Sequence, residues 1–137
     1  MNADKILTFA FMDPPFESER TVTFFRLLDA ALDKGAGVRV FAYEGAVALA
    51  FARQAPHGNA AHGHDVDQEA HPLTRSWIAA LQDKARAKGL GFEWINCGLC
   101  VDERGVNEAI ADCGRGGPAD LWRYASTAHN TLTIGTR

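Results

Sequence analysis

Short apolar runs alternate along this chain with segments in which apolar residues recur every three or four positions. The short runs are rich in β-branched and aromatic residues, as buried strands are. They cover residues 6–11, 38–43, 92–96 and 131–136. Strands that alternate with helices predict a parallel sheet covered by helices on both faces, with right-handed crossovers. We therefore expect one α/β domain over residues 1–137, with about five strands.

Local signals mark the ends of the longer helices. Ser18 precedes apolar positions at helical spacing and is a typical N-cap residue, and Gly35 ends that helix. A second helix, over about 77–85, ends at Gly89, and Pro118 suits the first turn of a third. These boundaries leave room for each helix to cross from one strand to the next.

The remaining segments are shorter or more polar. Residues 47–51 and 106–113 are predicted as short helices, and residues 115–117 as a turn. Residues 54–72 hold four of the five histidines, separated by Gly, Asn, Asp and Pro. Such composition is typical of an exposed loop. We expect this His-rich loop to interrupt an otherwise regular alternation.

Several aromatic residues fall at the apolar positions of the predicted elements. They are Phe24, Phe25, Trp77, Trp94 and Trp122. Because they follow the core periodicity, we interpret them as packing residues and not as a surface for stacking bases. A net charge of −3 also argues against a nucleic-acid binder, which usually has a basic face.

Composition narrows the class of protein. Hydrophobic residues make up 47% of the 137 positions and charged residues 23%, as in a globular domain. No apolar run reaches the roughly 20 residues that a membrane helix needs. The first residues have too short an apolar stretch and the wrong flanks for a signal peptide. We expect a cytoplasmic protein without a membrane partner.

The three cysteines, Cys97, Cys100 and Cys113, are too few and too close together for a disulfide framework. Cys97 directly follows a predicted strand, where reactive groups gather in open α/β sheets. A helix starting there would stabilise a thiolate, and Arg104 would add positive charge. Cys100, one turn along, is a candidate resolving thiol or second acceptor. The alternative is a pair of inert, buried cysteines, and Cys113 is interpreted as packing.

A metal site is a weaker interpretation of the same residues. Zinc in a structural site takes four ligands, and Cys97 and Cys100 supply only two. His62 and His64 complete the set only if the His-rich loop folds back over the cysteines. We therefore predict no metal and no cofactor.

Other polar constellations carry less information. Residues 115–117 precede a helix like a phosphate-binding turn, but they lack the P-loop lysine and the Rossmann glycine spacing. Ser126 and His129 have no evident third partner, so no catalytic triad is assigned. Asp13 and Glu17 follow the first strand and are candidates for a position near Cys97.

Four segments together resemble a known family. They are a strand followed by Pro15-Phe16, the run Val38–Phe41 leading to Glu44–Val47, the stretch from Cys97 to Val106, and Leu121–Ile134. In order and character they are similar to the DsrE/DsrF/TusD-like family of small sulfur-transfer proteins. The most specific feature is Cys97, which follows a strand and lies eight positions before Gly105.

The resemblance implies a flavodoxin-like α/β fold. It also implies that Cys97 accepts a persulfide sulfur and passes it to a partner, in sulfur oxidation or tRNA thiolation. Donor and acceptor proteins and a homotrimer or homohexamer are expected from it, and Cys100 matches a cysteine found in only part of the family. The His-rich loop departs from the pattern, and Glu103 beside Arg104 would offset the arginine's charge.

Three hypotheses follow from the residues and the resemblance. The leading one is a sulfur carrier or sulfurtransferase that holds a persulfide on Cys97. The second is a dithiol redox protein in which Cys97 and Cys100 cycle through a disulfide. The third is a non-catalytic subunit that acts through its oligomer surface.

Overall fold

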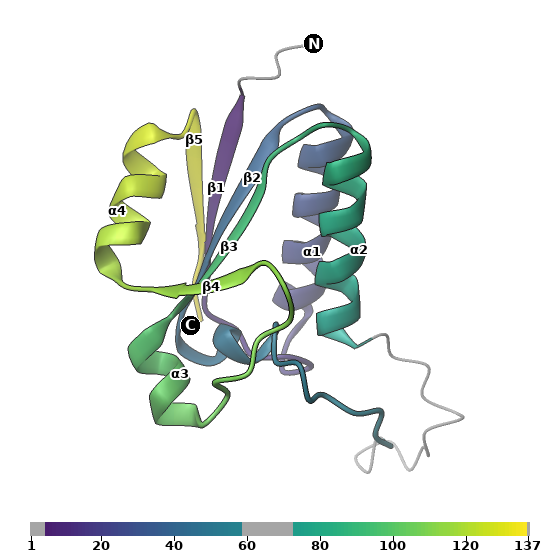
Figure 1. Cartoon of the computed structure of the whole chain (residues 1–137), viewed down its shortest axis with the longest axis vertical. Coiled ribbons are helices and arrows are strands. Elements are labelled where there is room, and N and C mark those ends of the chain that lie inside the picture. Colours follow the sequence, from purple (N-terminus) through teal and green to yellow (C-terminus); the bar gives the residue numbers. More distant parts are fainter. Residues whose placement is uncertain (1–4, 59–72, 137) are drawn as a thin grey trace.

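A five-stranded, fully parallel sheet forms the centre of the molecule (Figure 1). The computed structural model describes residues 5–58 and 73–136. The strands are β1 (Ile6–Phe11), β2 (Gly37–Ala42), β3 (Phe92–Cys97), β4 (Cys113–Gly116) and β5 (Asn130–Ile134). Their order across the sheet is β4-β3-β2-β1-β5, and each neighbouring pair is parallel. The predicted α/β fold with a parallel sheet is confirmed.

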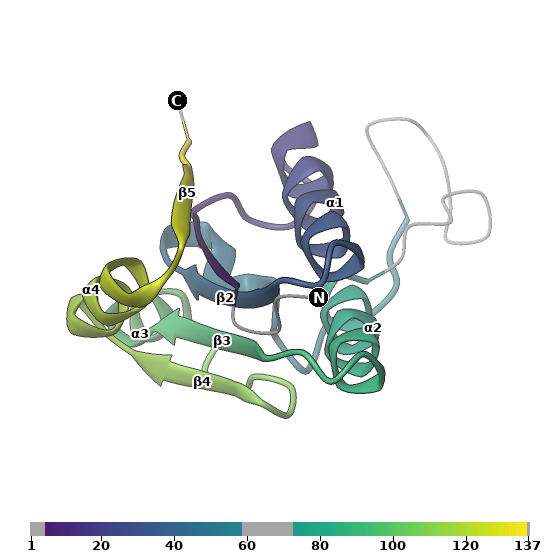
Figure 2. The ribbon, with the colours of Figure 1, turned by 90° about the horizontal axis from the view of Figure 1, so that it is seen from above.

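Helices cover both faces of this sheet, as predicted. The helices α1 (Glu19–Asp33) and α2 (Thr74–Ala87) lie side by side on one face, and α4 (Pro118–Thr127) covers the other (Figure 2). The short helix α3 (Gly98–Arg104) and a 3-10 helix, η1 (Glu44–Ala48), lie at the end of the sheet where the strands finish. We call this end the carboxyl edge.

The helix boundaries follow the local signals. The Ser18 hydroxyl caps α1 by accepting a hydrogen bond of 3.3 Å from the Arg20 backbone N–H. Gly35 and Gly89 follow the ends of α1 and α2 with φ of 79° and 67°, a left-handed conformation that glycine adopts without strain. Pro118 is the first residue of α4. These predictions are confirmed.

Aromatic rings fill the space between the sheet and the α1/α2 layer. Phe24 is fully buried and stacks on Phe11 with ring centroids 4.2 Å apart, and it meets Trp94 edge-on at 6.0 Å. Phe25 is also buried and stacks on the half-buried Trp77 at 4.6 Å. The packing role predicted for four of the five aromatic residues is therefore confirmed.

The prediction for Trp122 is wrong, because this side chain is 75% exposed. The buried or half-buried apolar positions of α4 and its C-cap residue are Leu121, Tyr124, Ala125 and Ala128, which recur at helical spacing. Tyr124, only 1% exposed, fills the contact with the sheet, and Trp122 lies outside that row. Trp122 is thus an apolar residue beside the buried row of α4, and the prediction wrongly included it in that row.

The helix predicted over 106–113 does not form. The backbone N–H of Ile110 donates to Ala50 at 2.9 Å, and that of Ala52 donates to Glu108 at 2.7 Å. Phe51 and Ala109 form an antiparallel bridge between these segments. Pairing with a distant segment replaces the local helical bonds. The helix predicted over 47–51 is displaced: the 3-10 helix η1 spans Glu44–Ala48, and Phe51 pairs with Ala109 instead.

The turn predicted at 115–117 is also wrong, because residues up to Gly116 belong to β4. Pairing with β3, in register from Trp94 with Cys113 to Cys97 with Gly116, holds this short strand. Two glycines give it little intrinsic strand preference. A Cβ at position 116 would contact Ile95 and the Asp120 carboxylate, so glycine permits the close approach. The edge strand therefore depends on its partner.

Within the described helices, none is long and apolar enough to cross a bilayer. Residues 54–58 of the predicted His-rich loop form no helix or strand. The other positions of that loop, 59–72, lie outside the described residues.

Replacing Gly45 by alanine is expected to lower the free energy of unfolding by about 1–3 kcal/mol. The new Cβ would lie 2.8 Å from Cδ and 2.9 Å from Cβ of Pro14, whose ring is rigid. Urea denaturation measures the loss. Gly91→Ala is the matched control, because its Cβ would meet nothing within 4 Å, and its stability should change by less than about 0.5 kcal/mol. Equal stabilities of the two variants would contradict the predicted clash.

Candidate functional site

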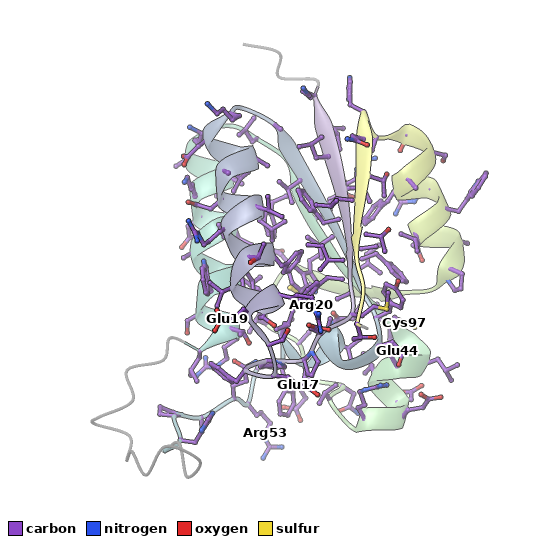
Figure 3. All side chains as sticks on the ribbon, turned by 180° about the vertical axis from the view of Figure 1, so that it is seen from behind. Glu17, Glu19, Arg20, Glu44, Arg53 and Cys97 are labelled. Atoms are coloured by element: carbon purple, nitrogen blue, oxygen red, sulfur yellow. The ribbon has the colours of Figure 1, made fainter. Side chains whose placement is uncertain are left out.

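Two cysteines lie one helical turn apart at the carboxyl edge. Cys97 ends β3 and is the N-cap residue of α3, so a helix does follow the strand directly, as expected. Figure 3 places Cys97 at this edge, near Glu44 of η1. Cys97 is half-buried, and Cys100 is buried, with 9% of its surface exposed. The structure thus brings the two predicted site cysteines together.

A small apolar cluster, separate from the main core, surrounds the pair. Its buried members are Val47, Cys100 and Val101, with Tyr43, Cys97 and Val106 packed against them at partial exposure. Burial, with the charge of Glu44 adding, raises the pKa of the Tyr43 hydroxyl, which therefore stays protonated at neutral pH. A sulfur atom at this place has apolar groups on one side and solvent on the other.

The Cys100 thiol is held by one backbone contact and by the cluster around it. The backbone N–H of Glu44 donates to its Sγ at 3.2 Å, and Cys97 packs against the same cluster. Burial, and next the neighbouring Cys97 thiol, raises the pKa of Cys100. This thiol therefore stays protonated at neutral pH, and Cys97 is the better exposed sulfur of the two.

Arg104, predicted to support Cys97, ends α3 and makes its contacts with carboxylates. Its Nη2 lies 3.0 Å from Oε2 of Glu44, and its Nη1 lies 3.7 Å from Oε2 of Glu103. Both contacts are exposed, so each pair is weak. The two carboxylates partly offset the positive charge of Arg104, as the sequence predicts for Glu103. Support of Cys97 by Arg104 stays a prediction.

Arg115 is a second cation at the site, which the sequence interpretation missed. Its side chain lies over Gly98: a Cβ on that glycine would be 2.7 Å from the arginine Nε. Asp102 binds both guanidinium nitrogens of Arg115, at 2.9 and 2.5 Å. The hydrogen bonds of Asp102 raise the pKa of Arg115, and the charges of Asp102 and Cys97 add to this. Arg115 thus places fixed positive charge beside the residue that follows Cys97.

The sequence placed Arg115 only in a predicted turn at 115–117, and no pattern linked it to Cys97. Its position depends on β4 pairing with β3, which sets Gly116 opposite Cys97. Because this pairing joins residues that are distant in sequence, a local sequence pattern does not predict it.

Cys113 has a different environment, at the start of β4. It packs against the main core, which confirms the packing interpretation. The side-chain amide of Gln82 donates to its Sγ at 3.7 Å. Burial, with the charge of Asp112 adding, raises the pKa of Cys113 to about 12. Since this thiol remains protonated well above neutral pH, it offers an internal comparison for Cys97.

The two acidic candidates after β1, Asp13 and Glu17, lie in different surroundings. Asp13 is buried and accepts hydrogen bonds from Ser18 Oγ at 2.5 Å and Arg20 Nε at 2.8 Å. It therefore holds the start of α1. Glu17 borders an open hollow of about 500 Å³ at the carboxyl edge, which Glu44 and Arg104 also line. Only Glu17 of the two therefore lies in a hollow next to the site.

Ser126 and His129 do not form a catalytic pair. The Ser126 hydroxyl donates to the backbone oxygen of Arg123 at 3.3 Å, and His129 Nδ1 accepts from the backbone N–H of Ile6 at 3.1 Å. Each of these two side chains is hydrogen-bonded to the backbone.

The zinc interpretation is only partly open to inspection. In the described ranges, no group of three or more His, Cys, Asp and Glu side chains comes together. His62 and His64, which the interpretation needs, lie outside the described residues. The prediction of no metal therefore stays a prediction.

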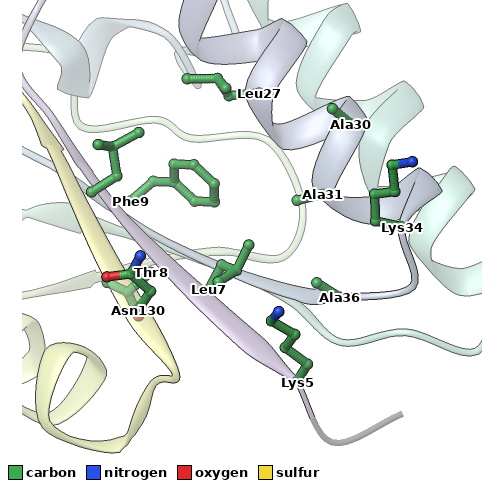
Figure 4. A pocket seen from close by; sticks show the side chains of 11 residues that line it. Lys5, Leu7, Thr8, Phe9, Leu27, Ala30, Ala31, Lys34, Ala36 and Asn130 are labelled. Atoms are coloured by element: carbon green, nitrogen blue, oxygen red, sulfur yellow. The ribbon is translucent and has the colours of Figure 1, made fainter. Parts of the chain in front are cut away.

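A second hollow lies away from the thiols, between α1 and β5 (Figure 4). It measures about 420 Å³ and is mainly apolar, with Leu7, Phe9, Leu27 and Leu132 in its wall. Lys5 and Lys34 border the hollow, and its strand residues come mostly from the amino ends of β1 and β5. No cysteine contributes to this groove.

Fold and site together define a small α/β protein with a cysteine pair at the carboxyl edge of a parallel sheet. The chain belongs to the DsrE/DsrF-like family, whose sequence model matches residues 5–134. Membership of this family points to a role related to sulfur relay. No curated protein matches the chain at a significant level.

Two solved structures have the same fold. The ychN protein of E. coli superposes with a TM-score of 0.66 at 22% sequence identity, covering 96% of this chain and 99% of its own. A conserved protein of unknown function from Bacteroides thetaiotaomicron gives a TM-score of 0.60 at 14% identity, covering 98% of both chains. At these identities the likeness concerns the fold alone.

Proposed function

We propose that this protein is a sulfur carrier that accepts a persulfide sulfur on Cys97 and delivers it to an acceptor protein. The observation that carries the proposal is the half-exposed Cys97 at the end of β3, in a chain of the DsrE/DsrF-like family. The cytoplasm, expected from the sequence, suits the proposal because its reducing conditions keep thiols free.

The transfer needs two displacement steps. First, the Cys97 thiolate attacks the outer sulfur of a donor persulfide, a new S–S bond forms on Cys97, and the donor leaves as a thiolate. Next, an acceptor thiolate attacks the same outer sulfur, and Cys97 leaves with the electron pair. No external oxidant or reductant is needed. The protein only has to favour the anion, shelter the persulfide and let a partner approach.

The neighbours of Cys97 fit these three requirements. Arg115, fixed by Asp102, supplies positive charge beside the thiol. The cluster around Tyr43 and Val101 excludes water from one side of the sulfur. Leu99, two residues after Cys97, is 68% exposed and offers an apolar contact to a docking donor or acceptor.

Incubation of the protein with polysulfide, followed by intact and peptide mass spectrometry, tests the proposal. In spectra taken immediately after loading, and in Cys100→Ser at later times as well, we expect one added sulfur atom per chain, on the peptide that contains Cys97, and its removal by an added thiol. Sulfur found only on the peptide that contains Cys113, or none at all on Cys100→Ser, would overturn the proposal.

We also propose that the chain forms a homo-oligomer, a trimer or hexamer. Within the described residues β5 is an edge strand, Leu132 on it is 44% exposed, and the apolar groove adjoins it. Such an unpaired, partly apolar edge is usually covered. Light scattering should give three or six times the chain mass, and Leu132→Glu should reduce it. A monomeric wild type would refute this assembly.

A dithiol redox function is the second candidate, because Cys100 and Cys97 pack in the same small cluster. In that case a mild disulfide oxidant would form the Cys97–Cys100 bond, and polysulfide treatment would remove two hydrogens without an added-sulfur species at any time. Spectra taken immediately after loading separate the two functions, because the carrier first shows an added sulfur. A stable added sulfur in Cys100→Ser, which cannot form this disulfide, favours the carrier.

A further inference from the structure

We propose that Cys100 discharges the persulfide on Cys97 as sulfide when no acceptor takes the outer sulfur. The proposal rests on the proposed function, since Cys97 must first be loaded. It adds a second outcome to the same site: relay to an acceptor, or release of sulfide.

The position of Cys100 decides which sulfur it can reach. A persulfide has an inner sulfur, which is Cys97 Sγ itself, and an outer sulfur bound to it. Cys100 lies one turn along α3, is buried, and packs in the same small apolar cluster as Cys97. Cys97 is the more exposed of the two. Cys100 therefore faces the inner sulfur, whereas an acceptor protein arriving from solvent meets the outer one.

The surroundings hold Cys100 for this attack. The Glu44 backbone N–H donates to its Sγ, and Val47 and Val101 pack around it. Because it is buried, Cys100 is not a good first acceptor for an external donor protein. Cys113, by contrast, packs at the main core with Gln82 and belongs to a different cluster. The chain thus has one thiol placed to receive sulfur and one placed to react with the loaded product.

The step balances without a further reactant. The Cys100 Sγ–Cys97 Sγ bond forms, and the bond between Cys97 Sγ and the outer sulfur breaks. The electron pair of the broken bond leaves with the outer sulfur as HS⁻, which takes up the proton of the Cys100 thiol. The outer sulfur is reduced to sulfide and Cys100 Sγ is oxidised, whereas Cys97 Sγ stays at the disulfide oxidation level. A dithiol reductant of the thioredoxin class would then restore both thiols for another turnover.

A single-turnover experiment tests the release. Wild type, Cys100→Ser and Cys113→Ser are reduced, loaded with polysulfide, and freed rapidly from excess reagent without any acceptor or reductant. Free sulfide is then measured over time with a sulfide-sensitive electrode, and intact mass follows the protein. Wild type and Cys113→Ser should release about one sulfide per loaded sulfur and end two hydrogens lighter than the dithiol form.

Cys100→Ser should keep its added sulfur at least about tenfold longer and release no burst of sulfide. Cys100→Ala provides a second variant, and thermal melting checks that both fold. Equal persulfide lifetimes in wild type and both variants, or a persulfide found on Cys100, would overturn the proposal. Failure of Cys100→Ser to load any sulfur, in a folded protein, would instead refute the carrier function, so the two failures are distinguishable.

Discussion

Cys97→Ser is expected to abolish sulfur loading, leaving the mass of the polysulfide-treated protein unchanged after desalting. The half-exposed Cys97 is the thiol that a donor can approach, whereas Cys100 is buried and the pKa of Cys113 is raised to about 12 by burial. A serine hydroxyl does not form a persulfide, because it carries no sulfur to bond the incoming atom. Intact mass spectrometry under non-reducing conditions gives the result directly.

Cys113→Ser is the matched control for this experiment. It removes one of the three thiols at a site that packs against the core, and its loading should equal that of wild type. Loading of Cys97→Ser to the wild-type level, with Cys113→Ser reduced, would reverse our assignment of the accepting residue. Thermal melting of both variants shows whether either change has altered the fold.

Arg115→Gln is expected to slow the reaction of Cys97 with iodoacetamide at neutral pH by about three- to tenfold. The guanidinium of Arg115 lies over Gly98 and is oriented by Asp102, so it favours negative charge on the adjacent sulfur. Glutamine keeps polar contacts but removes the charge. Alkylation rates are read from the peptide that contains Cys97, and equal rates in wild type and Arg115→Gln would contradict this prediction.

Arg104→Gln is the comparison variant, which distinguishes the effect of Arg104 on Cys97 from that of Arg115. Arg104 is the last residue of α3, whereas Cys97 caps its start and Arg115 lies over Gly98, so the loss of Arg104 should change the same rate by less than about twofold. High salt should reduce the difference in alkylation rate between wild type and Arg115→Gln, because the Arg115 side chain is exposed and its charge is screened. A larger effect for Arg104→Gln than for Arg115→Gln would restore the assignment made from the sequence.

Hydrophobic periodicity was sufficient to predict most of the fold. β1 and β2 are mostly buried and apolar, β3 alternates buried with more exposed positions, and α1 and α2 have stripes of buried residues that end just before a glycine. Each of these elements carries its own signal. The errors fall in the second half of the chain, where 106–113 pairs with 50–52 and β4 pairs with β3. Such bonds depend on contacts distant in sequence.

The site divides in the same way. Cys97 and Cys100 could be predicted because a strand, two thiols and a helix follow one another without interruption. Arg115 could not, since its approach to Gly98 needs a strand whose sequence, Cys-Gly-Arg-Gly, has the composition of a turn. Trp122 was misplaced for a related reason. Neighbouring positions on a helix can differ from buried to exposed, and the face that packs against the sheet determines which residue is buried.

The parallel direction of the strands has a practical consequence for binding studies. β1 starts at the edge of the sheet opposite the thiols, whereas β5 ends on the thiol side, where Thr136 borders the hollow shared with Glu44 and Arg104 (Figure 1). An affinity tag or surface tether attached after β5 would stand in the path of a docking donor or acceptor. Attachment ahead of β1 would present the cysteine pair freely to the solution, and sensor experiments with partner proteins are best designed in that orientation.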